Sequence, residues 1–525
     1  MLSTHAPMQS PPLGPPPAPQ APAARTGYPG FHHGVSLLHG WVPQVVAFVA
    51  VLLLVIAFAR ATRRWWVLWM PVCAVAGVVA AWAAWDFTAD QGLASDPAPV
   101  LLWACVGLTA AGLVAAVVGL RTGGWWQRIA AVLAVPVALL YTGVVLNQWV
   151  GYYPTVQAAW DALNADPLPH QVDADELPEL RNTDVGTGRI VEVDIPEAGS
   201  DFRHRQEYVY LPPAWFAGDK PPALPTVMMI GGEFNTPADW VRSGQIMPAV
   251  DAFAAKNGGV TPVLVFVDSG GSFNNDTECV NGPRGNAADH LTKDVPGYLE
   301  SEFGVAKDPA QWAVVGWSMG GTCAVDLAVM HPELFGTFVD IAGDLGPTSG
   351  TKEQTIKRLY GGNADAWTQF DPMTVMQRHG PYTGMVGVFD DLTAPKRGNG
   401  QQQSNGQQQS NGQQQGNGQQ QNEQQHGGGQ QHPGQQPAGQ QKMNFPGAPK
   451  VTEDQIGKGG RDGVQDTNEE GAAEQLCDEG RKVGIDCTVH TTVGGHTWQF
   501  AASAFTSTFP WLTARLGIPV PGLSS

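Results

Sequence analysis

Four apolar runs near the N-terminus constrain the fold more than any other feature of this 525-residue chain. They extend over roughly Trp41–Ala59, Trp65–Trp85, Pro99–Leu120 and Ile129–Val150. Each is close to the roughly 20 residues that a helix needs to cross a bilayer. Tryptophans gather near the ends of these runs, where indole rings favour the headgroup region. We therefore expect four transmembrane helices over residues 41–150.

The loops between these runs differ in charge. The first and third loops contain arginines and the second contains aspartates without Lys or Arg; the arginines are Arg60, Arg63, Arg64, Arg121 and Arg128. Loops rich in Lys and Arg stay in the cytoplasm. We therefore expect a multi-pass protein of the cell membrane with both termini outside. Residues 1–40, rich in Pro and Ala, are expected to form a disordered tail without a signal peptide.

The net charge of the chain limits the classes of partner that it can bind. There are 29 Lys and Arg against 47 Asp and Glu, a formal charge of −18. Because phosphate binding needs a basic face, this balance argues against a nucleic-acid partner.

A second pattern begins near Arg189, after an expected linker over residues 151–188. Short β-branched runs alternate with longer amphipathic ones, as in "RIVEVDI", "EYVYLPP", "PTVMMIGG", "TPVLVFVDS" and "QWAVVGWS". This alternation predicts a mostly parallel sheet with helices on both faces, extending over residues 189–517.

Ser318 lies in "GWSMGG", where a predicted strand meets a predicted helix. A G-x-S-x-G sequence in this context forms a tight turn that raises a nucleophilic serine above the sheet edge. An oxyanion would need two N–H donors. We expect one from the backbone of Met319 and the other from Gly232, with Glu233 as the alternative second donor.

A nucleophilic serine needs a base and an orienting acid, in the chain order Ser, Asp or Glu, His. His496 follows the last predicted strand and is the expected base, whereas His490 lies within that strand and is expected to be structural. The acid is expected from the loop after "TGMVGVF", which places Asp390 slightly ahead of Asp391. Two weaker candidates follow later in the chain, Glu469 and Glu470.

Residues 398–441 are a Gln-, Asn- and Gly-rich insert between the acid and the base. The insert has no aromatic residue and cannot bury a core, so we expect a disordered loop. Four cysteines lie in the soluble part, and an oxidising exterior permits both of their expected disulfides, Cys477–Cys487 and Cys279–Cys323.

Residues 189–517 resemble the esterase D / antigen 85 family of α/β-hydrolases. The resemblance rests on "GWSMGG", "GGHTW", "MMIGGEFNTPADW" and "LTKDVPGYLESEFGV". A membrane anchor of several helices ahead of such a domain resembles actinobacterial cell-envelope esterases. The resemblance implies hydrolysis or transfer of carboxylic esters, with no metal and no cofactor. The insert departs from the family's pattern and leaves the acid open.

The sequence therefore predicts an extracytoplasmic serine esterase held in the membrane. Its substrates are expected to be envelope lipid esters or aminoacyl-lipid esters. Two alternatives are an acyltransferase resembling the mycolyltransferases and a non-catalytic envelope or adhesion module.

Overall fold

The computed structural model describes residues 34–91, 98–122, 124–164, 166–393 and 468–520. The N-terminal part is helical, with elements α1 (Trp41–Phe58), a π-helical turn (Trp65–Trp69), α2 (Met70–Gln91), α3 (Val100–Thr122) and α4 (Trp125–Val150). Four helices here are long and apolar enough to cross a membrane, with mean hydropathies of 2.0 to 2.6. The predicted set of four apolar helices is confirmed.

Small residues line the contacts within this helical part. Helix α2 packs on α3, and α4 packs on both α3 and α1. Four alanines at these contacts are fully or almost fully buried: Ala57, Ala115, Ala131 and Ala134. A Cβ on Gly77 would lie 2.6 Å from the carbonyl oxygen of Gly107, so these two backbones meet directly. Larger side chains such as Val67 and Val78 are exposed, as lipid contact requires.

The segment that precedes α1 and the segment that follows α4 lie side by side. Ser36 and Thr155 form an antiparallel bridge. The N–H of Leu37 donates to the Pro154 carbonyl at 3.0 Å, and the N–H of Val156 donates to Val35 at 2.8 Å. A short helix, α5 (Val156–Leu163), follows this bridge.

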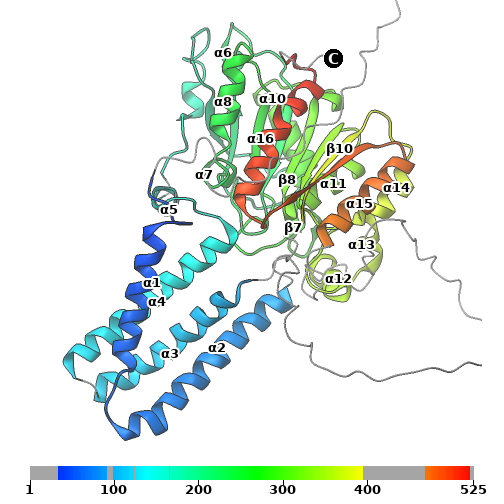
Figure 1. The fold of residues 1–525 in the computed structure, drawn as a ribbon. Helices are drawn as coiled ribbons and strands as arrows, with labels where there is room; N and C mark the ends of the chain where they lie inside the picture. The colour runs from blue at the N-terminus through cyan, green and yellow to red at the C-terminus, as the bar shows by residue number, and fades with distance from the viewer. Residues whose placement is uncertain (1–33, 92–97, 123, 165, 394–467, 521–525) are drawn as a thin grey trace, which may run out of the picture. The chain divides into compact units, whose positions relative to one another are not determined.

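A nine-stranded sheet forms the centre of the remaining chain (Figure 1). Its order is β1-β2-β3-β5-β4-β8-β9-β10-β11. Strand β3 is antiparallel to β2 and β5, and all other neighbours are parallel. The strands are β1 (Gln171–Val172), β2 (Arg189–Val193), β3 (Glu207–Leu211), β4 (Thr226–Ile230), β5 (Val263–Val267), β8 (Trp312–Trp317), β9 (Thr337–Ile341), β10 (Val386–Thr393) and β11 (Asp486–Val493). A separate hairpin pairs β6 (Asn281–Gly282) with β7 (Gly285–Asn286).

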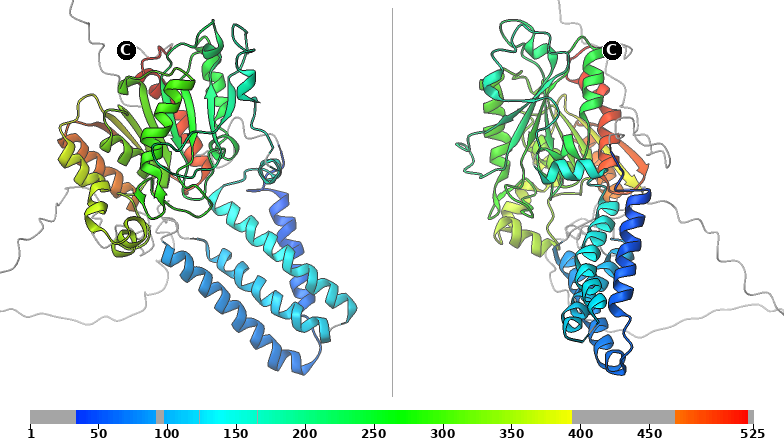
Figure 2. Two further views of the ribbon diagram at one scale, coloured as in Figure 1. Left: turned by 180° about the vertical axis from the view of Figure 1, so that it is seen from behind. Right: turned by 90° about the vertical axis from the view of Figure 1, so that its left-hand side faces the viewer.

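Helices cover both faces of this sheet (Figure 2). Helices α8 and α16 pack on one face, while α10, α11, α14 and α15 pack on the other. Their bounds and those of the smaller helices are α6 (Pro213–Phe216), α7 (Asp239–Arg242), α8 (Met247–Lys256), α9 (Ala287–Asp289), α10 (Val295–Glu302), α11 (Met319–Met330), α12 (Lys352–Tyr360), α13 (Ala364–Phe370), α14 (Pro372–His379), α15 (Asn468–Lys482) and α16 (Trp498–Arg515). The predicted α/β architecture is confirmed.

The expected linker differs from the structure, and the expected insert lies outside the described residues. Residues 151–188, expected to be a linker, contain α5 and also β1, which pairs in parallel with β2. The linker prediction is therefore wrong in part, because Gln171 and Val172 complete the edge of the sheet. The insert at 398–441 and most of the expected tail lie outside the described residues.

Candidate active site

Ser318 occupies a strained turn between β8 and α11. Its backbone has φ 59°, a left-handed conformation that costs a non-glycine residue free energy. A Cβ on Gly316 would lie 1.6 Å from the carbonyl oxygen of Gly320, so glycine is required at the first of these positions. The N–H of Ser318 donates to the Ile341 carbonyl at 2.9 Å, which ties the turn to β9. The turn has the geometry that the sequence predicts for a nucleophile.

His496 lies in the loop between β11 and α16. Its ring centroid is 4.2 Å from that of Trp317, the residue before Ser318. Thr497 caps the N-terminus of α16 through its side chain, and Trp498 packs edge-on against Trp240 at 5.2 Å. The predicted base therefore lies beside the residue that precedes the predicted nucleophile, and the helix that follows its loop packs against the α7 region.

Asp390 and Asp391 lie within β10, which continues to Thr393. The prediction that a loop carries them is wrong, because β11 remains paired with β10 along this whole length. Both carboxylates are buried, and successive residues of a strand face opposite sides of the sheet.

Asp390 accepts hydrogen bonds from His490 Nδ1 at 2.7 Å and from Thr508 Oγ1 at 3.2 Å. Burial raises the pKa of Asp390, and these partners oppose the shift. The structure thus joins Asp390 to the histidine that the sequence analysis treats as structural. The weaker acid candidates Glu469 and Glu470 fall in the first turn of α15.

Gly232 lies directly beside Ser318, since a Cβ on it would be 3.3 Å from the Ser318 Cβ. Its N–H donates to Asn235 Oδ1 at 2.7 Å, and the N–H of Asn235 donates back to the Gly232 carbonyl at 3.0 Å. The predicted donor Gly232 is therefore engaged within its own turn. Within the described residues, the N–H of the next residue, Glu233, has no acceptor. The other predicted donor, Met319, begins α11, where helix N–H groups are unpaired.

A group of carboxyls that the sequence analysis missed lies near the Gly232 turn. Burial and the neighbouring Asp276 raise the pKa of Glu233 to about 8, against the effect of Arg284. Burial raises the pKa of Asp276 to about 6, and Arg284 opposes this shift from 3.1 Å. Burial, with Asp276 and Asp344 nearby, raises the pKa of Glu278 well above its ordinary value. Glu233 follows β4, whereas Asp276 and Glu278 lie in one loop after β5, so no local pattern brings the three acids together.

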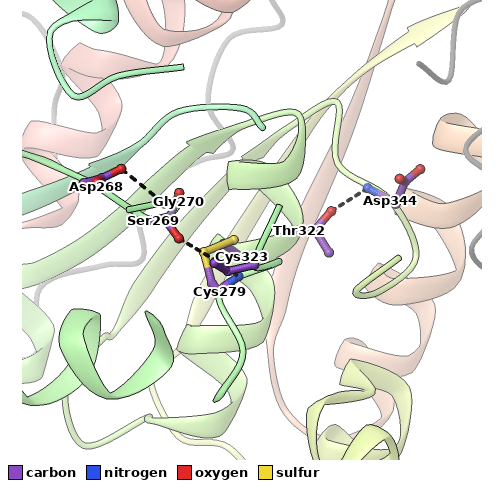
Figure 3. Close-up of a disulfide and its surroundings, with 8 residues drawn as sticks. Asp268, Ser269, Gly270, Cys279, Thr322, Cys323 and Asp344 are labelled. Carbon is purple, nitrogen blue, oxygen red and sulfur yellow. Dashed lines mark hydrogen bonds between the residues drawn. A yellow bond between two sulfur atoms is a disulfide. The ribbon is translucent and has the colours of Figure 1, made fainter. Parts of the chain in front are cut away.

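Both predicted disulfides are present. Cys279–Cys323 joins the loop after β5 to the second turn of α11, with the two Cα atoms 5.6 Å apart. Figure 3 shows this disulfide beside the hydrogen bond from the Asp344 N–H to Thr322 Oγ1, which measures 2.9 Å. The start of the helix that follows Ser318 is thus covalently fixed. Cys477–Cys487 joins α15 to β11.

His204, Glu207 and His290 are close enough to suggest a metal site. However, both ring nitrogens of His204 face backbone carbonyls, those of Arg205 at 2.8 Å and Ile195 at 2.7 Å. Carbonyls only accept, so both nitrogens must donate and the ring is an imidazolium. Burial lowers the pKa of His204, but Glu207 and the carbonyls outweigh it and leave the pKa raised. A ring in this state has no lone pair for a metal.

Comparisons with known proteins agree with this geometry. A family model described as "Putative esterase" matches residues 203–445. An uncharacterized protein of Corynebacterium glutamicum is 30% identical over 305 residues, which cover 56% of this chain and 70% of that protein.

Two solved structures are also similar to this chain. An S-formylglutathione hydrolase from Agrobacterium tumefaciens is 17% identical, covering 64% of this chain and 98% of its own, with a TM-score of 0.40. MPT51 of Mycobacterium tuberculosis is 18% identical, covering 62% of this chain and 97% of its own, with a TM-score of 0.34. The chain belongs to the family described as putative esterases, and it is an enzyme that acts on ester bonds.

Proposed function

We propose that this protein is a membrane-anchored serine esterase that hydrolyses envelope lipid esters or aminoacyl-lipid esters outside the cytoplasm. The observation that carries the proposal is the strained Ser318 turn, with the His496 ring 4.2 Å from that of the adjoining Trp317 and tilted by 32°. Strain of this kind persists only where surrounding structure holds it, and it is frequent at nucleophiles.

Hydrolysis follows a two-step course with these residues. Ser318 Oγ attacks the ester carbonyl while His496 accepts its proton, and the alcohol leaves with that proton. Water then attacks the acyl-enzyme, again with His496 as base, and releases the acid. The oxyanion formed in each step accepts hydrogen bonds from Met319 N–H and from the Gly232 turn. Because Asn235 engages the Gly232 N–H, we assign the second donor to Glu233.

For the orienting acid we propose Asp391. The carboxylate oxygens of Asp390 accept from His490 and Thr508, which already gives this residue a structural role between β11 and α16. Asp391 is buried to the same degree one position further along β10. A carboxylate in this role holds the base in the tautomer that can accept the serine proton.

An outer location is supported by three features. The arginine-bearing loops of the helical part precede α2 and α4, as expected for cytoplasmic loops. The Ser36–Thr155 bridge places the start of α1 and the end of α4 on one side. The two disulfides suit an oxidising compartment. Substrates embedded in the outer surface of the membrane would be within reach of such an enzyme.

The test compares the full-length protein with its Ser318→Ala variant in detergent micelles. The substrates are a short-chain nitrophenyl ester and lipid extracts of the cell envelope. We expect the variant to lose on the order of 10³-fold or more in kcat, and to lose labelling by a fluorophosphonate probe. Ser301→Ala, a change at an exposed serine, serves as the control. Full activity in Ser318→Ala would end the serine-esterase proposal.

The same assay separates the two acids. Asp391→Asn should lower kcat strongly, because His496 would then adopt the wrong tautomer. Asp390→Asn should lower the thermal unfolding midpoint with a smaller effect on kcat, because it weakens a buried contact to His490. The reverse result would return the acid role to Asp390 and leave the rest of the mechanism unchanged.

A further inference from the structure

The residues that follow α4 contact both loops of the candidate active site. We call Gly151–Thr155 the exit segment. The carbonyl of Gly151 accepts a hydrogen bond from Gln499 Nε2 at 2.9 Å, three residues beyond His496. A Cβ on Gly151 would lie 3.0 Å from the Thr497 Cβ, so the segment passes tightly against the loop of the base.

Tyr152 contacts the other loop, the one that contains Gly232. Its hydroxyl donates to Asp239 Oδ2, and the Asn235 side chain lies within hydrogen-bonding range of the same hydroxyl. Asp239 is only 4% exposed. The same carboxylate oxygen also accepts from the N–H and, at 2.9 Å, from the hydroxyl of Thr236. Tyr152 therefore completes the hydrogen bonding that holds residues 235–239.

Asn235 links this network to the nucleophile. Its side chain accepts the Gly232 N–H at 2.7 Å, and its backbone closes the turn onto the Gly232 carbonyl. Its own carbonyl accepts from Arg205 Nη2 at 2.8 Å. The Gly232 turn, which lies against Ser318, is therefore held on one side by Arg205 and on another by Tyr152.

We propose that Tyr152 is a positioning residue of the active site, through which the exit segment fixes the Gly232 turn for oxyanion stabilisation. This inference rests on the proposed function, because it assigns a role in ester hydrolysis. An oxyanion donor acts on the transition state, and a small displacement of a preorganised donor raises the barrier to reaction. Loss of the Tyr152 hydroxyl should therefore lower kcat while leaving KM nearly unchanged.

The test uses Tyr152→Phe in the full-length protein, with Tyr153→Phe as the matched control. Tyr153 packs edge-on against Tyr152 at 4.8 Å, and its hydroxyl donates no hydrogen bond to a described residue. We expect about a 10-fold lower kcat in Tyr152→Phe, with KM within about 2-fold of wild type, since one hydrogen bond to a charged group is lost. An unchanged kcat, or an equal fall in Tyr153→Phe, would overturn the proposal.

A second arm distinguishes positioning from a general loss of stability. Asn235→Ala should also lower kcat, and adding Tyr152→Phe to it should cause little further loss, because both changes act through the same turn. Independent, multiplicative losses would show that Tyr152 acts elsewhere and would contradict the proposal. If wild type hydrolyses no ester and resists the fluorophosphonate, the proposed function itself fails. If wild type is active and Tyr152→Phe is equally active, only this inference fails.

Discussion

At the scale of single residues, the raised pKa of Glu233 is a property that sequence patterns do not reveal. It follows Gly232 directly, so its carboxyl belongs to the turn beside Ser318. Burial and Asp276 raise its pKa to about 8 from an ordinary 4.5. The folded protein therefore binds this proton more tightly than the unfolded chain does. Between pH 4.5 and 8 this group makes stability fall as pH rises, and above pH 8 it places a negative charge near the proposed oxyanion site.

Glu233→Gln should remove the alkaline fall in activity. In wild type, kcat/KM should fall near pH 8, as ionised Glu233 disfavours a second negative charge. The Gln variant should keep its plateau to higher pH, as measured by kcat/KM between pH 5 and 10. Glu333→Gln, at an exposed surface position, is the control. An identical alkaline limb in both variants would show that another group titrates there.

At the scale of single residues, the sequence predicted local backbone geometry and disulfide pairing, but not the hydrogen-bond partners that come from distant parts of the chain. The strained turn at Ser318 was predictable from its local context, and the two disulfides were predictable from the number and spacing of the four cysteines. The hydrogen-bond partner of Asp390 was not predictable, because it depends on the register of β10 against β11, which places Asp390 opposite His490. The role of Tyr152 was not predictable either, because its hydrogen bond to Asp239 joins residues that lie 87 positions apart in the sequence.

At the scale of elements, helix α11 is held at its start from two sides. The Ser318 turn ties it to β9, and Cys279–Cys323 ties its second turn to the loop after β5. In that loop Glu278 and Cys279 both have positive φ, of 49° and 50°. The disulfide and the Thr277 hydrogen bonds keep this strained backbone against α11.

The two disulfides should contribute unequally to stability. Cys279–Cys323 closes a loop of 44 residues and Cys477–Cys487 closes one of 10. From loop entropy alone, the first should contribute about 4 kcal/mol and the second about 2.7 kcal/mol. The double Ser variant of the first pair should therefore have the lower unfolding midpoint, as followed by tryptophan fluorescence. The variant of the second pair is the matched control, and the opposite order would contradict this expectation.

Most strands of the sheet were predictable from the pattern of β-branched runs in the sequence. The five quoted β-branched runs all form strands, as do the runs before Asp390 and His496. The end of β10 was misjudged because strand ends depend on whether the neighbour continues, and β11 does. The strand β1 was missed because two residues carry no pattern. The imidazolium of His204 was also missed, since its carbonyl partners come from the fold.

At the scale of the whole molecule, the arginines of the first and third loops and the even number of apolar helices together predict the side on which the enzyme works. An even number of spans returns the chain to the side where it began, in agreement with the bridge between Ser36 and Thr155. A fusion at Ser525 should therefore activate a reporter that works only outside the cytoplasm. A matched fusion in the Arg60–Arg64 loop should activate only a cytoplasmic reporter. Cytoplasmic activity from the Ser525 fusion would refute this topology.

The short exit segment has a kinetic consequence. Gly151 alone separates the end of α4 from Tyr152, and one residue spans no more than about 3.5 Å of extended chain. If the proposed lipid esters are its substrates, a site tethered so closely should meet them by lateral diffusion within one leaflet. Its velocity should then follow the mole fraction of substrate in that leaflet. Diluting the substrate with inert phospholipid should slow turnover even when its total amount in the sample is unchanged.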